Sequence, residues 1–287
     1  MKMADLIRVA KSACPEEIAW TRGEAYGEYN IEDYNKDVKK VLYCVTATPH
    51  VVDYFKKNGY DLLISHHPFR TSVPQLIFHT ALDCCEGGLN DQWRDHLQLK
   101  APYKHFDGTL GWHGEIDPMP FQELVQKVAL FSGSKTIDGE IYCDKPNRLI
   151  KSVVICSGLG GMVTELALAS GADCYIIGEK IQSGKTSGFK AMIETGHTNS
   201  EWMGVLLFKK ILKGVQVDLV PQELDYFGRE KHAKQPPVLP HSQEALKPSW
   251  DWYDDRDDDF LYDREEDVTL VEQNGVYTFE KKKKKLF

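Results

Sequence analysis

The sequence contains no hydrophobic run long enough to cross a membrane and no CxxC pair among its seven cysteines. No stretch approaches the ~20 apolar residues that a transmembrane helix requires, and the N-terminal segment has no apolar core before its charged residues. The cysteines are odd in number and mostly lie within apolar segments, which predicts reduced thiols rather than a disulfide framework. We therefore expect a cytoplasmic protein without a membrane partner.

An excess of positive charge is also missing. The formal net charge is -8 and the sequence pI is about 5.7, so the chain as a whole does not attract the phosphates of nucleic acids or anionic lipids. A Walker-type phosphate loop is absent as well, because SGKTSG at residues 183–188 lacks the leading glycine at the required spacing. Metal cations, small molecules or other proteins are the expected partners, and we expect no direct binding of nucleic acid.

Alternating strand and helix patterns occupy most of the 287 residues. Buried strands are predicted at 39–48 and 61–65, joined by a helix that begins at a proline and ends at Asn-Gly, and the same strand, helix, strand order returns at 148–179. This order predicts an α/β protein made of two similar α/β lobes packed together, at residues 1–120 and 121–226, with a site between them at the strand ends.

The other segments have weaker patterns. We expect helices at 3–12, 90–99, 121–133 and 199–214, a short helix at 189–197, strands at 76–83 and 215–220, and loops at 20–36 and 106–120.

Residues 227–287 differ in character from the rest of the chain. Residues 251–267 contain ten acidic and two basic residues, a net charge of -8 that equals the charge of the whole chain. This run predicts a solvated or disordered tail, although the interleaved aromatic residues are also compatible with a segment that docks onto its own or another subunit. Residues 268–280 alternate apolar and polar side chains around a central Asn-Gly, which predicts a small hairpin.

Two adjacent histidines, His66 and His67, follow the second predicted strand directly. In open α/β folds, ligands bind at the carboxyl ends of the strands, where the loops diverge. A single histidine at a strand end is more often a structural or surface residue, but a pair at the point where the backbone turns can face two adjacent positions. That geometry suits two metal ions better than one.

Three more candidate donors follow along the chain. Asp83 comes directly after an apolar strand pattern, where a carboxylate can bind a divalent cation or instead cap a helix or turn. His197 and Glu201 share one face if they form the first turn of the next helix, although a capping Thr or Ser with a first-turn Glu explains the same residues. The five candidates include no thiolate, which favours zinc, iron or manganese, and they suffice for two ions with a bridging carboxylate.

Three segments in this order, ISHHPF, FHTALDCCEGGLND and GHTNSE, resemble the signature segments of the GTP cyclohydrolase 1 type 2 family, also described as NGG-interacting-factor-three-like dinuclear metal proteins. GEIDPMPFQELVQKV resembles the family's connector between lobes, and ICSGLGGMVTELALASGADCYIIGE resembles its second-lobe strand, glycine turn, helix and strand. The chain departs from the family in three places. The segment GEKIQSGKTSGF lacks the histidine often found after the second-lobe strand, and only 11 residues separate His67 from His79, which is fewer than usual. The acidic tail is not part of the family pattern.

The resemblance implies a ligand set and an assembly. Two divalent metal ions per subunit would be bound by His66, His67, Asp83, His197 and Glu201. Glu201 would bridge the two ions, and His79 would lie close by and orient a ligand or the substrate. The subunits would form a toroidal homohexamer whose metal sites face an internal cavity.

Two different functions are compatible with such a centre. The first is a hydrolase in which a metal-bridged water attacks a small, nucleotide-like substrate, and the family name indicates the imidazole ring of the guanine of GTP. No residue is assigned as general acid. The alternative is a non-catalytic, metal-binding hexameric scaffold or adaptor that uses the acidic tail to bind partners. A third reading, an α/β interaction module without metal, would make the three matching segments a coincidence.

Overall fold

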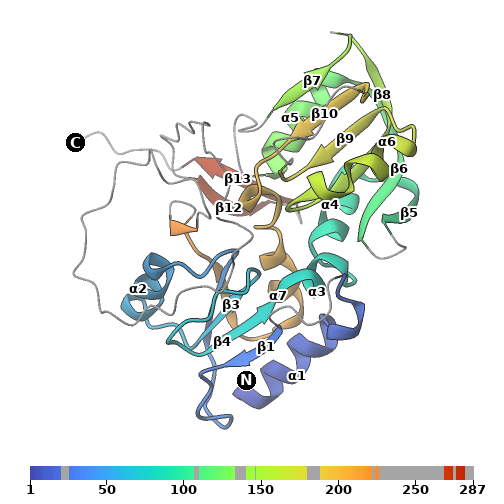
Figure 1. The fold of residues 1–287 in the computed structure, drawn as a ribbon. Coiled ribbons are helices and arrows are strands. Elements are labelled where there is room, and N and C mark those ends of the chain that lie inside the picture. The colour runs from blue at the N-terminus through green and yellow to red at the C-terminus, as the bar shows by residue number, and fades with distance from the viewer. Residues whose placement is uncertain are drawn as a thin grey trace, which may run out of the picture.

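The computed structural model describes residues 1–20, 26–106, 110–132, 140–145, 147–179, 188–221, 224–225, 268–273 and 276–281. Within these residues the chain forms two larger β-sheets with helices packed on them, and a separate two-stranded sheet. The two larger sheets lie toward opposite ends of the molecule (Figure 1). The predicted α/β fold with two lobes is therefore confirmed.

The first sheet has five strands in the order β1 (Tyr26–Tyr29), β4 (Gln75–Phe78), β3 (Leu62–Ser65), β2 (Lys40–Cys44) and β11 (Gln216–Leu219). Strand β1 runs antiparallel to its neighbour, and the other four strands are parallel. Because parallel strands end at the same edge of a sheet, the residues that follow β2, β3 and β4 are brought to one edge.

Three helices cover the two faces of this sheet: α1 (Met3–Ala13), α2 (Pro49–Lys57) and α7 (Gly204–Ile211). The side chains of β2 alternate between the two faces, so that Leu42 packs in the cluster that contains α2 and Tyr43 packs in the cluster that contains α1 and α7. Helix α2 starts at a proline, and the Thr48 side chain accepts the Val51 N–H at 3.2 Å as its N-cap. Burial on both faces explains why the strands appear in the sequence as continuous apolar runs.

The second sheet has six strands in the order β5 (Lys100–Phe106), β6 (Leu110–Pro120), β8 (Leu149–Cys156), β9 (Cys174–Ile177), β10 (Ala191–Glu194) and β7 (Ile141–Cys143). The helices of this part are α3 (His79–Cys84), α4 (Leu89–Leu97), α5 (Phe121–Phe131) and α6 (Thr164–Ala169). Side chains of α5 pack with Val153 on one face, and Ala167 of α6 packs with Val154 on the other. Helices α3 and α4 lie between the two sheets (Figure 1).

Two predicted loops were wrong. Residues 20–36 contain β1, which pairs with β4, and residues 106–120 contain β6, the central partner of β5 and β8. Glycine and polar residues interrupt the apolar alternation of both segments, and β4 and β8, which pair with β1 and β6, follow much later in the chain. A register shift between Glu115 and Met119 accommodates the irregular part of β6. Tertiary pairing thus outweighs local propensity in both segments.

Two other predicted elements were also wrong. Residues 189–197 contain strand β10, which lies between β9 and β7 and is buried, rather than a short helix. The predicted strand at 76–83 ends at Phe78, and α3 begins immediately at His79. A short apolar run fits a buried strand and a buried helix equally well, and the sheet in which it packs decides between them.

The sheets do not follow the predicted boundary at residue 120. Strands β5 and β6, which precede this residue, belong to the second sheet, whereas β11 near the end of the second segment pairs with β2 in the first. The chain therefore leaves the first sheet after β4 and returns to it through α7 and β11. Both crossings pass the region between the sheets.

The predicted C-terminal hairpin is confirmed, because β12 (Val268–Gln273) and β13 (Val276–Lys281) pair antiparallel. Strand β13 lies beside α5. The predicted acidic tail at 251–267 lies outside the described residues. Among the described helices, none has the length and apolar character needed to cross a membrane.

Candidate metal centre

His66 and His67 directly follow β3, at the edge where the parallel strands of the first sheet end. The His66 N–H donates to the Cys44 carbonyl at 3.2 Å, and the His67 N–H donates to the Val45 carbonyl at 2.7 Å. Both side chains are buried, and their ring centroids lie 5.1 Å apart. The backbone of the neighbouring strand therefore holds the two imidazoles at the expected edge of the sheet.

Asp83 reaches the same place from a helix rather than from a strand end, which corrects the prediction. It lies in α3, four residues after His79, and this spacing puts both side chains on one helix face. The Ser157 hydroxyl donates to Asp83 Oδ1 at 2.8 Å. The other oxygen, Oδ2, lies 3.7 Å from His66 Nε2.

His197 and Glu201 flank a short 3-10 turn, η3 (Thr198–Ser200), and α7 begins only at Gly204. The predicted placement in the first turn of the long helix was therefore wrong. The turn nevertheless brings His197 Nε2 to 3.3 Å from Glu201 Oε1. Gly158 faces this carboxylate, and a Cβ at that position would lie 2.3 Å from Oε1.

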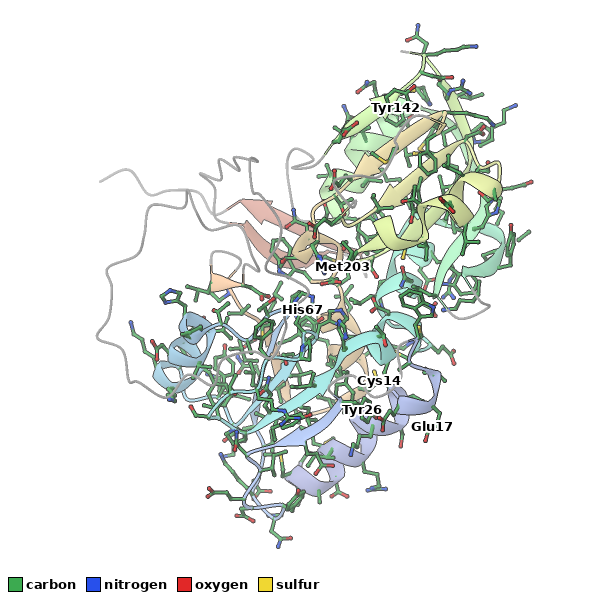
Figure 2. The ribbon with its side chains drawn as sticks, viewed as in Figure 1. Cys14, Glu17, Tyr26, His67, Tyr142 and Met203 are labelled. Atoms are coloured by element: carbon green, nitrogen blue, oxygen red, sulfur yellow. The ribbon has the colours of Figure 1, made fainter. Side chains whose placement is uncertain are left out.

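The five predicted ligands form two groups that share Glu201. In the first group, His66 Nε2 lies 3.3 Å from Glu201 Oε1 and Asp83 completes the set. In the second, His67 Nε2 lies 3.2 Å from Glu201 Oε2 and 3.2 Å from His197 Nε2. Within each group, one ligand atom from every residue lies within 4.8 Å of the others. Figure 2 places His67 in the middle of the molecule.

The charges of the cluster shift the pKa values of its members in different directions. Burial acts to raise the pKa of Glu201, but the imidazoles of His197, His66 and His67 outweigh it and hold this pKa well below its usual value. Burial lowers the pKa of His67 to about 3. For His66 and His197 burial acts in the same direction, but nearby carboxylates, Glu201 first, outweigh it and raise the pKa. Burial raises the pKa of Asp83.

The donor set fits a divalent cation. Glu201 Oε2 is buried and accepts no hydrogen bond, although buried carboxylate oxygens normally have a donor. The facing nitrogens of His67 and His197 cannot both donate to each other, so at least one of them presents a lone pair rather than a proton. Imidazole nitrogens with carboxylate oxygens and no thiolate suit zinc, iron or manganese.

Four supporting residues were not found from the sequence. Thr46 Oγ1 lies 2.8 Å from His67 Nδ1, and Glu179 Oε2 lies 2.8 Å from His197 Nδ1. Ser157 binds Asp83, and Asn90 accepts the Ser157 N–H at 2.9 Å. Glu179 was detectable, because it comes two residues after the end of the buried strand β9. Such contacts orient a ligand through the ring nitrogen or oxygen that faces away from the metal.

His79 lies beside the histidine pair, as the resemblance implies. Its ring centroid is 5.1 Å from that of His66 and 5.9 Å from that of His67. These three histidines form a third group whose ligand atoms are close enough to share a cation. His79 is also less buried than its two neighbours, so it is the imidazole of the three that is more accessible to a substrate.

Comparison with known proteins gives consistent matches over most of the chain. A family model described as Duf34/NIF3 (NGG1p interacting factor 3) matches residues 1–77 and 72–223. A "GTP cyclohydrolase 1 type 2 homolog" from Streptococcus pneumoniae serotype 4 is 27% identical over 263 residues, which cover 78% of this chain and 97% of the relative. A protein of the same description from Methanocaldococcus jannaschii is 23% identical over 261 residues, with coverage of 79% and 100%.

Solved structures show the same fold. Reduced HcgD from Methanocaldococcus jannaschii superposes with a TM-score of 0.62 at 22% identity, over 79% of this chain and 98% of that protein. A Bacillus cereus protein related to NIF3 superposes with a TM-score of 0.61 at 15% identity, over 76% of this chain and 96% of the other.

Proposed function

The chain belongs to the Duf34/NIF3 family, and from that premise we propose that it is a dinuclear metal-dependent hydrolase that acts on a small, nucleotide-like substrate. The observation that carries the proposal is the pair of ligand groups that share one buried carboxylate, Glu201. Relatives described as GTP cyclohydrolase 1 type 2 homologs support a nucleotide as the first substrate to test.

In this proposal one ion would be held by His66, Asp83 and Glu201, and the second by His67, His197 and Glu201. When bound, a pair of divalent ions would supply hydrolytic chemistry, because metal ions lower the pKa of bound water to about 7 and polarise the bond under attack.

The residues of the chain preorganise this site. Glu179 and Thr46 contact the outer nitrogens of His197 and His67, which leaves both Nε2 atoms directed at the centre. Gly158 leaves room for the Glu201 carboxylate, and Ser157 fixes one oxygen of Asp83. Because these contacts exist before any substrate binds, little reorganisation is needed during the reaction.

We also propose that the chain assembles as a homohexamer with the sites facing an internal cavity, as the family resemblance implies. The expected mass in solution is six times the 32.7 kDa of one chain. Light scattering measures this mass directly, and a monomer would contradict the assembly without affecting the ligand set.

Metal content and turnover test the function together. Protein purified without chelator should contain two divalent ions per chain and hydrolyse GTP or another member of a nucleotide panel, with activity lost on chelation and restored by metal. Glu201→Gln and His67→Ala should reduce both quantities, since each removes a donor. Asp61→Asn, at the other end of β2, should change neither.

The outcomes separate the candidate functions. Two ions per chain without turnover on any substrate would support the non-catalytic scaffold. A metal-free protein, or variants at Glu201 and His67 with unchanged metal content, would contradict the metal centre itself.

A further inference from the structure

Asp225 is a fully buried carboxylate beside the carboxyl end of β2, where the chain returns after β11. Its Oδ2 accepts the Val45 N–H at 2.7 Å, and its Oδ1 accepts the Thr46 N–H at 2.6 Å. Thr48 adds a further hydrogen bond, because its hydroxyl donates to the Leu224 carbonyl at 2.9 Å. Hydrogen bonds therefore hold residues 224–225 against the short segment between β2 and α2.

The same segment contacts the candidate centre. Thr46 Oγ1 lies 2.8 Å from His67 Nδ1, and the Val45 carbonyl accepts the His67 N–H at 2.7 Å. A continuous path of hydrogen bonds thus runs from the Asp225 carboxylate through the Val45–Thr46 backbone to both the main chain and the ring of His67.

The ring of His67 needs a defined tautomer to act as a ligand. Its Nε2 faces Glu201 Oε2 at 3.2 Å, so metal binding requires the lone pair on Nε2 and the proton on Nδ1. In that tautomer the Nδ1–H donates to Thr46 Oγ1. The Thr46 contact therefore holds Nδ1 on the outer side of the ring and leaves Nε2 facing the centre.

We propose that Asp225 is a positioning residue for His67: it holds the Val45–Thr46 backbone so that the Thr46 hydroxyl contacts Nδ1 and leaves Nε2 directed at the second ligand group. This inference rests on the proposed metal-binding function and extends it to a carboxylate outside the ligand set. It also makes the site depend on the segment that follows the last strand of the first sheet.

The chain contains a matched control. Asp61 Oδ2 accepts the N–H groups of Lys39 and Lys40, at 2.9 and 3.1 Å, at the amino end of the same strand. Asp61 and Asp225 each accept hydrogen bonds from two consecutive backbone N–H groups at an end of β2. Only the groups that Asp225 binds lie next to His67. Asp61 therefore provides a merely structural carboxylate beside the same strand.

Metal binding is the first measurement, with Co²⁺ alone as the probe in competition with a chromophoric chelator. Asp225→Asn and Thr46→Val should each weaken one of the two binding steps by about 10–100-fold, the range found when a residue that orients a ligand is lost. Thr46→Ser, which keeps the hydroxyl, and Asp61→Asn should leave both steps close to wild type. Equal losses in Asp61→Asn and Asp225→Asn, or no loss in Asp225→Asn, would overturn the proposal.

The contact at His67 Nδ1 is the second measurement, by ¹⁵N NMR of the histidine ring nitrogens in the metal-free protein. The wild type and Asp61→Asn should give the same Nδ1 signal, and Asp225→Asn and Thr46→Val should displace it, because the contact with the Thr46 hydroxyl is loosened or lost. A purely structural role would lower the unfolding temperature without moving this signal. If Asp225→Asn fails to fold, Asp225→Glu, which keeps the charge but moves the carboxylate, is measured in its place.

The two proposals fail differently. A wild-type protein that binds no Co²⁺ contradicts the metal function, whereas a His67 Nδ1 signal that is unchanged in Asp225→Asn contradicts the role of Asp225.

Discussion

Gly158 shows how a residue without a side chain shapes the candidate centre. It has a positive φ of 59°, and a Cβ there would lie 2.3 Å from Glu201 Oε1. Its N–H donates to the Ser200 hydroxyl at 2.8 Å, so the backbone itself packs against the turn that carries Glu201. In the sequence this residue is recognisable only as part of a glycine turn, and its contact with Glu201 depends on the tertiary structure.

We expect Gly158→Ala to displace the Glu201 carboxylate and weaken metal binding by about tenfold or more, the effect expected when a ligand loses its orientation. Overpacking should also destabilise the fold by about 1–3 kcal/mol. Gly171→Ala is the matched control, because Gly171 has a φ of 71° but open space around the new Cβ. Calorimetric metal titration and thermal unfolding of both variants check this, and equal metal affinity in the two would contradict it.

The seven cysteines lead to a prediction of reactivity. All are free, and six are buried, whereas Cys143 is half-buried. Burial raises the pKa of Cys44, Cys156 and Cys174 well above the usual value, so few of these thiols ionise at pH 8.

A thiol reagent should therefore label Cys143 first in the native protein and all seven thiols after denaturation without reductant. Cys143→Ser should remove the fast phase, while Cys174→Ser should leave it intact. Fewer than seven thiols after denaturation would reveal a disulfide, for which Cys14 and Cys85, with sulfur atoms 3.4 Å apart, are the nearest pair described.

At the scale of elements, the contact between α4 and α5 contains a partly buried histidine outside the candidate metal centre. His96 of α4 stacks on Phe131 of α5 with ring centroids 4.0 Å apart and planes inclined by 5°. Its Nε2–H donates to the Lys127 carbonyl at 3.1 Å. Burial lowers the pKa of His96 to about 4.

This contact should lose stability in acid. In the unfolded chain His96 has a pKa of about 6.5, so the unfolded state takes up a proton before the folded state does. The contribution is complete above that pKa and falls as the pH decreases towards about 4. Between pH 7 and pH 5 the free energy of unfolding should decrease by about 2 kcal/mol from this residue alone. His96→Gln should flatten the pH dependence by that amount in urea unfolding, and parallel curves would contradict the assignment.

Elements with strong local signals were predictable, and elements defined by their partners were not. Helices α1 and α2 have amphipathic spacing or a capped start, and β2 and β3 are continuous apolar runs, so each was expected near its observed position. Strand β10 lies within a segment predicted to be a helix, because AMIE has no period of its own and pairing with β9 and β7 makes it a strand.

At the scale of the whole molecule, the candidate centre joins parts that the chain reaches separately. His66 and His67 stand at the end of β3 in the first sheet, Asp83 comes from α3, and His197 follows β10 of the second sheet. Figures 1 and 2 show this region between the two sheets. Ions bound there would crosslink the two sheets.

Metal should therefore stabilise the entire fold and not only the site. At a free metal concentration of 100 times Kd, each site adds about 2.7 kcal/mol, which corresponds to a rise in Tm of about 5–10 °C for a chain of this size. Scanning calorimetry with and without chelator measures the shift. Glu201→Gln should abolish most of it, and Asp61→Asn should retain it. A shift that survives in Glu201→Gln would place the stabilising ions elsewhere.

The sequence by itself determined the α/β class, the first βαβ unit and the five candidate ligands, because apolar runs, caps and the order of the three motifs are local properties. Only the tertiary structure decided that Asp83 lies on a helix, that Glu201 is shared by both ligand groups, and that Thr46, Glu179 and Asp225 support the site. These contacts join residues up to 180 positions apart, such as Val45 and Asp225, and no periodicity within a segment encodes a contact of that separation.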